Sequence, residues 1–193
     1  RQRQMCIRDR DNIRAEGRRM KALVEDMLTL FRAQKNAGSP PDTVTDLSEA
    51  AVTAALRFEP VAFEAGKPLE ERITADITVV GDADRLRRLI SILLDNAVKY
   101  GAEGGHITLT LEKTDRQARL TVSNPGDPIP PEHLAHLFER FYRADASRGE
   151  KSGFGLGLAI ADTIAWEHKG ALKAESDAAS TRFTFTMPLR KQA

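Results

Sequence analysis

An amide, a cation and an aromatic ring stand close together in the sequence, at Asn96, Lys99 and Tyr100. A side-chain amide can bind Mg²⁺ through its oxygen, an ammonium group can neutralise phosphate charge, and a phenol ring can cover one edge of a base. These residue types are typical of a nucleotide site carried by a helix. The alternative is an amphipathic helix with a solvated edge, because short patterns also arise by chance.

A second candidate segment, residues 124–130, follows directly on a predicted strand. The side-chain amide of Asn124 can accept a hydrogen bond from the exocyclic amine of adenine and donate one to a ring nitrogen. Gly126 allows the backbone to approach a base closely. Taken alone, the segment is more simply explained as a turn rich in Pro and Gly.

Aromatic and basic side chains gather in residues 137–143. Phe138 and Phe141 are predicted to pin a mobile segment to the core, and Arg143 is long enough to reach a terminal phosphate through paired hydrogen bonds. The competing interpretation is a satellite hydrophobic cluster beneath a long loop.

Three glycines alternate immediately before an apolar helix, at Gly153, Gly155 and Gly157. Such a stretch exposes backbone N–H groups and a positive helix N-terminus to phosphate oxygens. Because no Lys-Ser or Lys-Thr pair follows the glycines, this is not the phosphate loop of the common nucleoside triphosphatases. A dinucleotide-binding pattern is not completed either, since no acidic residue stands at the end of the following strand.

One long helix is predicted to carry the first group of polar residues. It runs from about Ala83 to Tyr100, with Asp82 as its N-cap and Gly101 as its end. Its apolar residues recur at three- and four-residue intervals and form one core-facing stripe. The stripe consists of Leu86, Leu89, Ile90, Leu93, Leu94 and Ala97.

Strands and further helices surround this helix in the sequence. The clearest hairpin joins the alternating segments 106–111 and 118–123. Shorter strands are predicted over residues 44–46, 68–73, 77–80, 171–176 and 182–187, and further helices over 47–66, 131–138 and 156–169. The order indicates an α+β fold, a two-layer α/β sandwich in which helices cover one face of a mixed, mostly antiparallel sheet.

A long helix is expected ahead of this domain. Over residues 11–36 the apolar residues follow a heptad-like stripe, which predicts a helix that packs against partner helices. Gly, two prolines and small polar residues make 37–42 a linker, so the main domain is predicted at 43–190. Residues 1–10 show no period and are set aside as a non-native or disordered end.

The composition is that of an ordinary globular chain. Its 193 residues hold 29 Lys and Arg against 28 Asp and Glu, a formal net charge of +1, which gives no argument for nucleic acid or a membrane surface as a partner. The single Cys6 excludes an internal disulfide and offers no metal cluster. Because no apolar run approaches the roughly 20 residues of a membrane span, the chain is expected to be cytoplasmic.

Taken in order, the four segments resemble the nucleotide-binding motifs of the catalytic, ATP-binding domain of sensor histidine kinases. Residues 95–100 match the asparagine box, 124–129 the first glycine box, 138–142 the phenylalanine box and 153–158 the second glycine box. The helix around residues 19–28 looks like the second helix of the family's dimerisation and histidine-phosphotransfer hairpin. The resemblance implies an ATP-dependent protein-histidine kinase of a two-component system.

The resemblance also implies roles for individual residues. ATP would be the substrate, with Mg²⁺ held by Asn96. Lys99 and Arg143 would contact the phosphates as the catalytic residues, Tyr100 would flank the adenine, and Asn124 would bind its amine. The complete implied set of nucleotide-binding residues is Asn96, Lys99, Tyr100, Asn124, Gly126, Ile129, Phe141, Arg143, Gly153, Gly155, Leu156, Gly157, Leu158 and Thr181.

The implied partners are a phosphoacceptor histidine of the same protein or its dimer mate and the receiver domain of a response regulator. The intact protein would be a membrane-anchored homodimer with this domain in the cytoplasm, and no nucleic acid is implied. In the family the acceptor histidine is followed by an acidic residue and then by Arg or Lys, Thr or Asn, and Pro. None of His106, His133, His136 and His168 has that context. The acceptor helix is therefore expected outside this chain, and His106 and His168 are predicted to be structural.

Four positions depart from the family pattern. Asn124 replaces the usual aspartate, Pro128 and Ser180 replace glycines, and Ile92 replaces an asparagine one turn before Asn96. In related ATPases of the gyrase and chaperone type, the last position resembles the site of a glutamate that activates water, and Ile92 cannot act as a base. Transfer to a partner side chain is therefore favoured over rapid hydrolysis. Two alternatives remain open, a catalytically degenerate ATP-binding or dimerisation module and an anti-sigma-factor type serine/threonine kinase.

Overall fold

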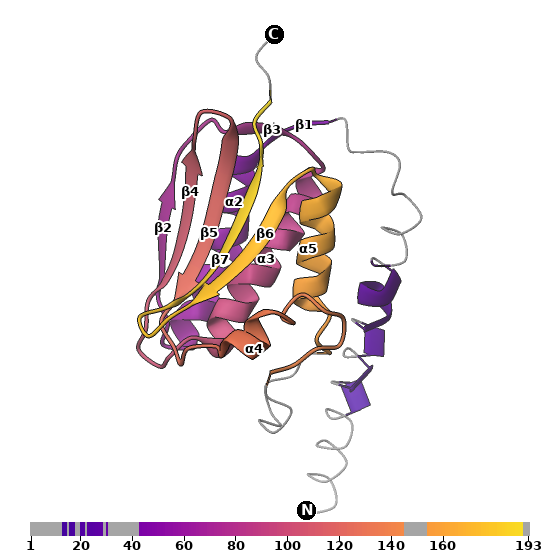
Figure 1. The fold of residues 1–193 in the computed structure, drawn as a ribbon, viewed down its shortest axis with the longest axis vertical. Helices are drawn as coiled ribbons and strands as arrows, with labels where there is room; N and C mark the ends of the chain where they lie inside the picture. Colours follow the sequence, from indigo (N-terminus) through magenta and orange to yellow (C-terminus); the bar gives the residue numbers. More distant parts are fainter. Residues whose placement is uncertain are drawn as a thin grey trace, which may run out of the picture.

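The computed structural model describes residues 43–144 and 154–190, together with residues 13–14, 16–17, 20–21, 23–28 and 30 of a preceding helix. Its main domain consists of two layers, a twisted sheet and a helical layer packed on one face of that sheet (Figure 1). The predicted α+β sandwich is confirmed. The predicted end at 1–10 and the linker at 37–42 lie outside the described residues.

Five strands form the main sheet in the order β2-β4-β5-β7-β6. Their bounds are β2 Leu69–Ile73, β4 Ile107–Lys113, β5 Gln117–Asn124, β6 Ala171–Ser176 and β7 Thr181–Pro188. Because β2 pairs with β4 in parallel and the other neighbours are antiparallel, the sheet is mixed and mostly antiparallel, as predicted. β1 (Val44–Asp46) and β3 (Thr78–Val80) form a separate antiparallel pair.

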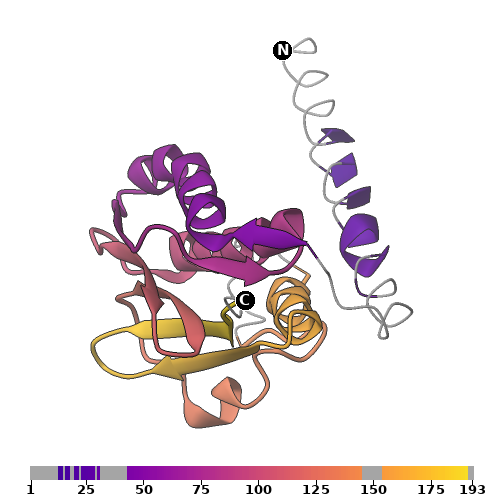
Figure 2. The ribbon, with the colours of Figure 1, turned by 90° about the horizontal axis from the view of Figure 1, so that it is seen from above.

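Strand alternation gives the sheet one apolar and one polar face. Along β4, Ile107, Leu109 and Leu111 are buried, while Thr108 and Thr110 lie on the opposite face. The helices α2, α3 and α5 lie on one side of the sheet (Figure 2). The core is therefore the space between this helical layer and the apolar face of the sheet.

The helices are α2 Leu47–Glu64, α3 Ala83–Tyr100, α4 Pro131–Leu134 and α5 Gly157–Glu167. α3 begins at its predicted cap, because the Asp82 side chain accepts hydrogen bonds from the backbone N–H groups of Asp84 and Arg85 at 2.9 and 3.1 Å. All six residues of its predicted apolar stripe are buried. α2 and α5 flank this helix (Figure 1).

The predicted helix over 131–138 is wrong in its length, since α4 covers only Pro131–Leu134. Beyond it, the backbone N–H groups of His136 and Glu139 donate to the carbonyl oxygens three residues earlier, at His133 and His136. Bonds of this i→i−3 kind make tight turns, so the segment does not continue as an α-helix.

α3 and α5 are joined where α3 begins and α5 ends. Arg85 Nη1 lies 2.5 Å from Glu167 Oε2. His168 is 3% exposed, accepts the N–H of Asp82 at Nε2 over 3.0 Å, and has Nδ1 2.7 Å from the carbonyl oxygen of Ile164. Because the backbone N–H can only donate, Nε2 carries the lone pair and Nδ1 the proton. The prediction that His168 is structural is confirmed.

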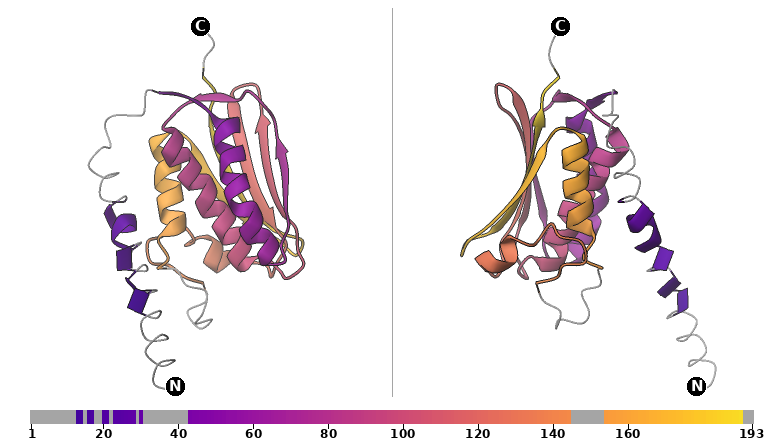
Figure 3. Two further views of the ribbon diagram at one scale, coloured as in Figure 1. Left: turned by 180° about the vertical axis from the view of Figure 1, so that it is seen from behind. Right: turned by 45° about the vertical axis from the view of Figure 1, so that its right-hand side comes forward.

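A helix precedes the main domain, as predicted. Its described residues between Ile13 and Leu30 lie on the helical side of the molecule (Figure 3). Leu30 is buried in the core and Leu23 packs against that core. Asp26 Oδ1 lies 2.7 Å from Arg88 Nη2 on α3. The C-terminal part of this helix therefore rests against α3.

Candidate nucleotide site

Asn96 lies near the C-terminus of α3, with its amide oriented by the helix itself. Its Nδ2 donates to the carbonyl oxygen of Ile92, one turn earlier, at 3.2 Å. The amide oxygen is then the atom left to bind a cation. Such an oxygen suits Mg²⁺, which prefers hard oxygen donors.

Lys99 and Tyr100 follow in the last turn of α3. Lys99 Nζ lies 2.5 Å from Asp95 Oδ2, an ion pair between side chains one turn apart that are both partly exposed. The carboxylate takes up one of the three ammonium N–H groups, so a phosphate oxygen can still be bound by the others. Tyr100 is exposed at the end of the helix.

Asn124 ends β5 and is 4% exposed. Its Nδ2 donates to the carbonyl oxygen of Pro125 at 3.2 Å, which directs the amide as an acceptor toward other partners. A Cβ atom on Gly101 would lie 3.5 Å from the Cβ atom of Asn124, and the N–H of Ala102 donates to Pro125 over 2.8 Å. The end of β5 therefore packs against the end of α3.

Gly126 and Thr181 lie next to this amide. A Cβ atom on Gly126 would come within 3.2 Å of the backbone at the end of α3, so the bare glycine fits the close approach. Thr181 lies opposite Asn124 in the β5–β7 register. Its Oγ1 is 2.7 Å from the Oγ of Ser176, and that Oγ accepts the N–H of Ile129 at 2.9 Å.

The N-terminus of α5 reaches the same region as the C-terminus of α3. Leu156 is buried and provides no side-chain cap, so the first backbone N–H groups of α5 have no capping side chain at that position. A Cβ atom on Gly157 would lie 3.4 Å from Cγ2 of Ile92, which places the helix start within one turn of Asn96 along α3. Leu158 follows, half-buried. Helix N-termini of this kind bind phosphate oxygens.

The two phenylalanines of the aromatic segment behave differently. Phe138 packs against the core, as predicted. Phe141 is 58% exposed, so the prediction that it pins the segment to the core is wrong. Its φ of +64° and its N–H donation to the carbonyl oxygen of Gly155 at 2.9 Å fix the backbone in a turn that leaves the ring in solvent. Arg143 is exposed, and Gly153 lies outside the described residues.

The structure thus gathers the predicted residues into two neighbouring groups. The base group, around the end of β5, comprises Tyr100, Asn124, Gly126, Ile129 and Thr181. The phosphate group comprises Gly155, Leu156, Gly157 and Leu158 at the start of α5, together with Asn96 and Lys99 in the last turns of α3. Phe141 joins the phosphate group through its backbone bond to Gly155.

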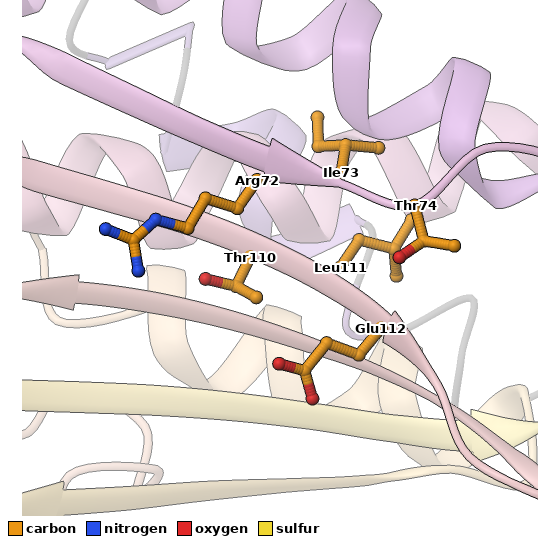
Figure 4. Close-up of a pocket in the computed structure, with 6 residues that line it drawn as sticks. All are labelled: Arg72, Ile73, Thr74, Thr110, Leu111 and Glu112. Atoms are coloured by element: carbon orange, nitrogen blue, oxygen red, sulfur yellow. The ribbon is translucent and has the colours of Figure 1, made fainter.

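A shallow depression of about 410 Å³ lies elsewhere, on β2 and β4. It is lined by Arg72, Ile73, Thr74, Thr110, Leu111 and Glu112. In Figure 4 the side chain of Ile73 points to one side of the strands, and the polar side chains of Arg72, Thr110 and Glu112 do not point to that side. The depression contains none of the predicted site residues.

Three residues without an assigned role in the sequence analysis also contact the site: Ser176, His133 and Tyr142. Ser176 was foreseeable, because it stands opposite Thr181 at the end of a predicted strand pair. The bond of 2.6 Å between His133 Nδ1 and the Tyr142 hydroxyl was not, because it joins irregular segments that carry no periodic pattern.

The described residues lack two other kinds of feature. None of their helices combines the length and apolar character that a membrane crossing requires. Among the same residues, no cluster of three or more His, Cys, Asp or Glu side chains is arranged to hold a metal ion.

Known proteins resemble this chain in both sequence and fold. The sensor histidine kinase CusS of Escherichia coli (strain K12) is 41% identical over 172 residues, which cover 88% of this chain and 35% of that protein. The sensor protein DltS of Streptococcus agalactiae is 33% identical over 93% of this chain and 45% of its own length. The chain thus spans roughly a third to a half of these relatives.

Solved structures show the same architecture. The mycobacterial sensor histidine kinase MprB has a TM-score of 0.69 at 29% identity, covering 78% of this chain and 100% of that one. The catalytic domain of the histidine kinase ThkA has a TM-score of 0.66 at 28% identity, covering 76% and 94%. ThkA in complex with the response regulator protein TrrA, at 22% identity and a TM-score of 0.67, shows the shared fold alone.

A family model described as histidine kinase-, DNA gyrase B-, and HSP90-like ATPase matches residues 81–191, from the cap of α3 to beyond β7. The matched range contains both groups of the candidate site. The chain therefore belongs to the histidine kinase-, DNA gyrase B- and HSP90-like ATPase family, and within it to the catalytic, ATP-binding domains of sensor histidine kinases.

Proposed function

We propose that this domain binds Mg·ATP between α3, α5 and the end of β5, and delivers the γ-phosphoryl group to a histidine on a phosphotransfer helix. One observation carries the proposal. The start of α5 lies against Ile92, because a Cβ atom placed on Gly157 would lie 3.4 Å from Cγ2 of Ile92. Ile92 stands one helical turn before Asn96, so the start of α5 lies within one turn of the Asn96 amide. An anion-binding helix terminus and a hard oxygen ligand are adjacent there, as phosphoryl transfer requires.

The metal would be held by the Asn96 oxygen together with phosphate oxygens. When bound, Mg²⁺ neutralises charge on the phosphates. The open N–H groups at the start of α5 and the ammonium of Lys99 would hold the phosphates beside it, with Arg143 as a further cation from the aromatic segment. Lys99 must then share its charge between Asp95 and phosphate.

The base would lie against the base group. The side-chain oxygen of Asn124 would accept a hydrogen bond from the exocyclic amine of adenine, because Nδ2 of the same amide already donates to the carbonyl oxygen of Pro125. Tyr100, exposed at the end of α3, would cover one edge of the base. The hydroxyl pair of Thr181 and Ser176 supports the floor of the site.

Transfer to a side chain is favoured over hydrolysis by Ile92. This residue stands one turn before Asn96 and contacts the start of α5, where a water-activating carboxylate would otherwise belong. In the transfer step, an imidazole nitrogen of the acceptor forms a bond to the γ-phosphorus as the bond to the β,γ-bridging oxygen breaks, and ADP leaves. The protein contributes position and charge neutralisation.

The partners follow from the same chemistry. The acceptor would be a histidine of the intact protein or its dimer mate, with the heptad-like helix over residues 11–36 as the dimerising segment and 43–190 as the catalytic unit. Onward transfer would be to a response regulator receiver domain, the kind of partner with which ThkA forms a complex. The intact protein would be anchored in a membrane with this domain on the cytoplasmic side.

The test is to mix the chain with labelled Mg·ATP and a separately supplied phosphotransfer helix hairpin, and to assay for acid-labile phosphohistidine. Calorimetry on the same sample measures ATP binding. Bound ATP with no labelled histidine would contradict transfer. Absence of ATP binding would favour the catalytically degenerate module, for which Ile92, Pro128 and Ser180 are the sequence arguments.

A further inference from the structure

The base group and the phosphate group of the candidate site are joined by a continuous series of contacts through α4. At the base end, Ser176 Oγ bonds to Thr181 and accepts the N–H of Ile129. Two residues later the chain enters α4, where the N–H of His133 donates to Pro130 over 2.9 Å. α4 is therefore tied to the last two strands of the sheet.

Tyr142 is held by two histidines, His133 in α4 and His136 just beyond it. Its hydroxyl lies 2.6 Å from Nδ1 of His133, a short and strong hydrogen bond. The ring of His136 lies 5.5 Å from the tyrosine ring, centroid to centroid. His136 is itself oriented by Glu139, whose Oε1 lies 2.7 Å from its Nδ1. Tyr142 thus has both a polar and an aromatic anchor.

The backbone at Tyr142 packs against the residues that lead into α5. Gly155 has a φ of +68°, and a Cβ atom there would lie 2.6 Å from the carbonyl oxygen of Tyr142. The neighbouring Phe141 donates its N–H to Gly155 at 2.9 Å. Since Gly157 opens α5 two residues later, the phosphate-binding helix start is packed directly on the segment that His133 anchors.

We propose that His133 and Tyr142 are positioning residues of the nucleotide site, and that their hydrogen bond sets the separation between the base group and the phosphate group. The proposal rests on the proposed function. Neither residue is placed against the nucleotide. Each residue acts through the backbone. His133 positions the segment that starts at Ile129, and Tyr142 positions Gly155.

The consequence is specific to ligands that occupy both groups at once. Mg·ATP and Mg·ADP need both groups at the correct separation, whereas adenosine needs only the base group. Loss of the bond should raise the dissociation constants of both nucleotides by about 3- to 10-fold, which corresponds to the free energy of one partly buried hydrogen bond. Adenosine affinity should stay within about twofold, because the base group keeps its own contacts.

The experiment measures dissociation constants of Mg·ATP and adenosine for the wild-type chain, Tyr142→Phe, His133→Leu and the double variant. Tyr142→Phe removes one hydroxyl and keeps the ring. The two single variants and the double variant should lose similar Mg·ATP affinity, because each breaks the same bond. His133→Asn, which keeps a polar atom near the position of Nδ1, should retain most of it. His106→Asn, at an exposed histidine, is the matched control and should bind like the wild type.

Three outcomes would overturn this proposal while leaving the proposed function standing. They are unchanged Mg·ATP binding in Tyr142→Phe, an equal loss for adenosine and Mg·ATP, and strictly additive losses in the double variant. A wild-type chain that binds no Mg·ATP would instead overturn the proposed function itself.

Discussion

At the scale of single residues, the candidate metal site depends on the Asn96 amide. Its Nδ2 donates to the carbonyl oxygen of Ile92, so Oδ1 is the atom left to bind the proposed Mg²⁺. Asn96→Ala removes this oxygen and keeps a good helix former. We expect the affinity for ATP in the presence of Mg²⁺ to fall by about 100-fold or more, because a metal stabilises phosphate charge by several kcal/mol.

Calorimetric titration with ATP in Mg²⁺ and in a chelator checks this prediction. The variant should differ from the wild type chiefly when Mg²⁺ is present. Asn96→Asp, which keeps an oxygen ligand, is the matched control and should lose far less. An equal loss with and without Mg²⁺ would mean that Asn96 contacts the nucleotide directly or supports the fold.

At the scale of elements, His168 connects the two helices that form the site. Burial lowers the pKa of His168 below its ordinary value, and the positive charge of Arg85 lowers it further. The Ile164 carbonyl and the carboxylates of Glu167 and Asp82 favour the charged imidazole, but burial outweighs them. Protonation would also remove the lone pair that accepts the Asp82 N–H. The neutral ring therefore holds the end of α5 on the start of α3.

This arrangement predicts a pH-dependent stability. Because the pKa of the folded state lies below the ordinary value of about 6.5, the unfolded chain takes up a proton that the folded chain refuses. The stabilisation is complete above about pH 6.5 and is lost as the pH falls below it, by at most about 1.4 kcal/mol per pH unit. Urea unfolding between pH 7.5 and 5.5 should show this loss in the wild type and not in His168→Gln. If both proteins showed the same pH dependence, His168 would not be the titrating group.

At the scale of the whole molecule, the described residues of the preceding helix contact the domain through the Asp26–Arg88 ion pair and through the apolar side chains of Leu23 and Leu30. Burial raises the pKa of Asp26, although Arg88 favours its charged form. Both side chains keep about a third of their surface exposed, so the pair should contribute about 0.5–1 kcal/mol. The helix should thus detach far more easily than the domain unfolds.

Hydrogen exchange of the amides in residues 23–28 measures this attachment. Asp26→Ala and Arg88→Ala should each speed exchange there by about 2- to 5-fold, with no further change in the double variant. Arg88 has further interactions, so the cycle rather than one variant isolates the pair. Amides of β4 serve as the internal control and should not change. Additive effects would show that the two side chains act separately.

The sequence by itself determined the elements and the order of the motifs. The buried stripe of α3, its Asp82 cap and the β4–β5 hairpin all follow from periodicity and capping, which are local properties. The four motifs could be placed on these elements because each lies at a predicted strand end or helix terminus. The two-layer sandwich followed because amphipathic strands and helices must bury one face each.

Only the tertiary structure decided which side chains meet across long separations. It placed the start of α5 on Ile92, exposed Phe141 against expectation, shortened α4, and bonded His133 to Tyr142 and His168 to Asp82. Turns and loop contacts carry no periodic pattern, and their geometry depends on how distant elements pack. The sequence therefore identified candidate residues of a nucleotide site, and the packing of α3, α4 and α5 decided which of them lie close together.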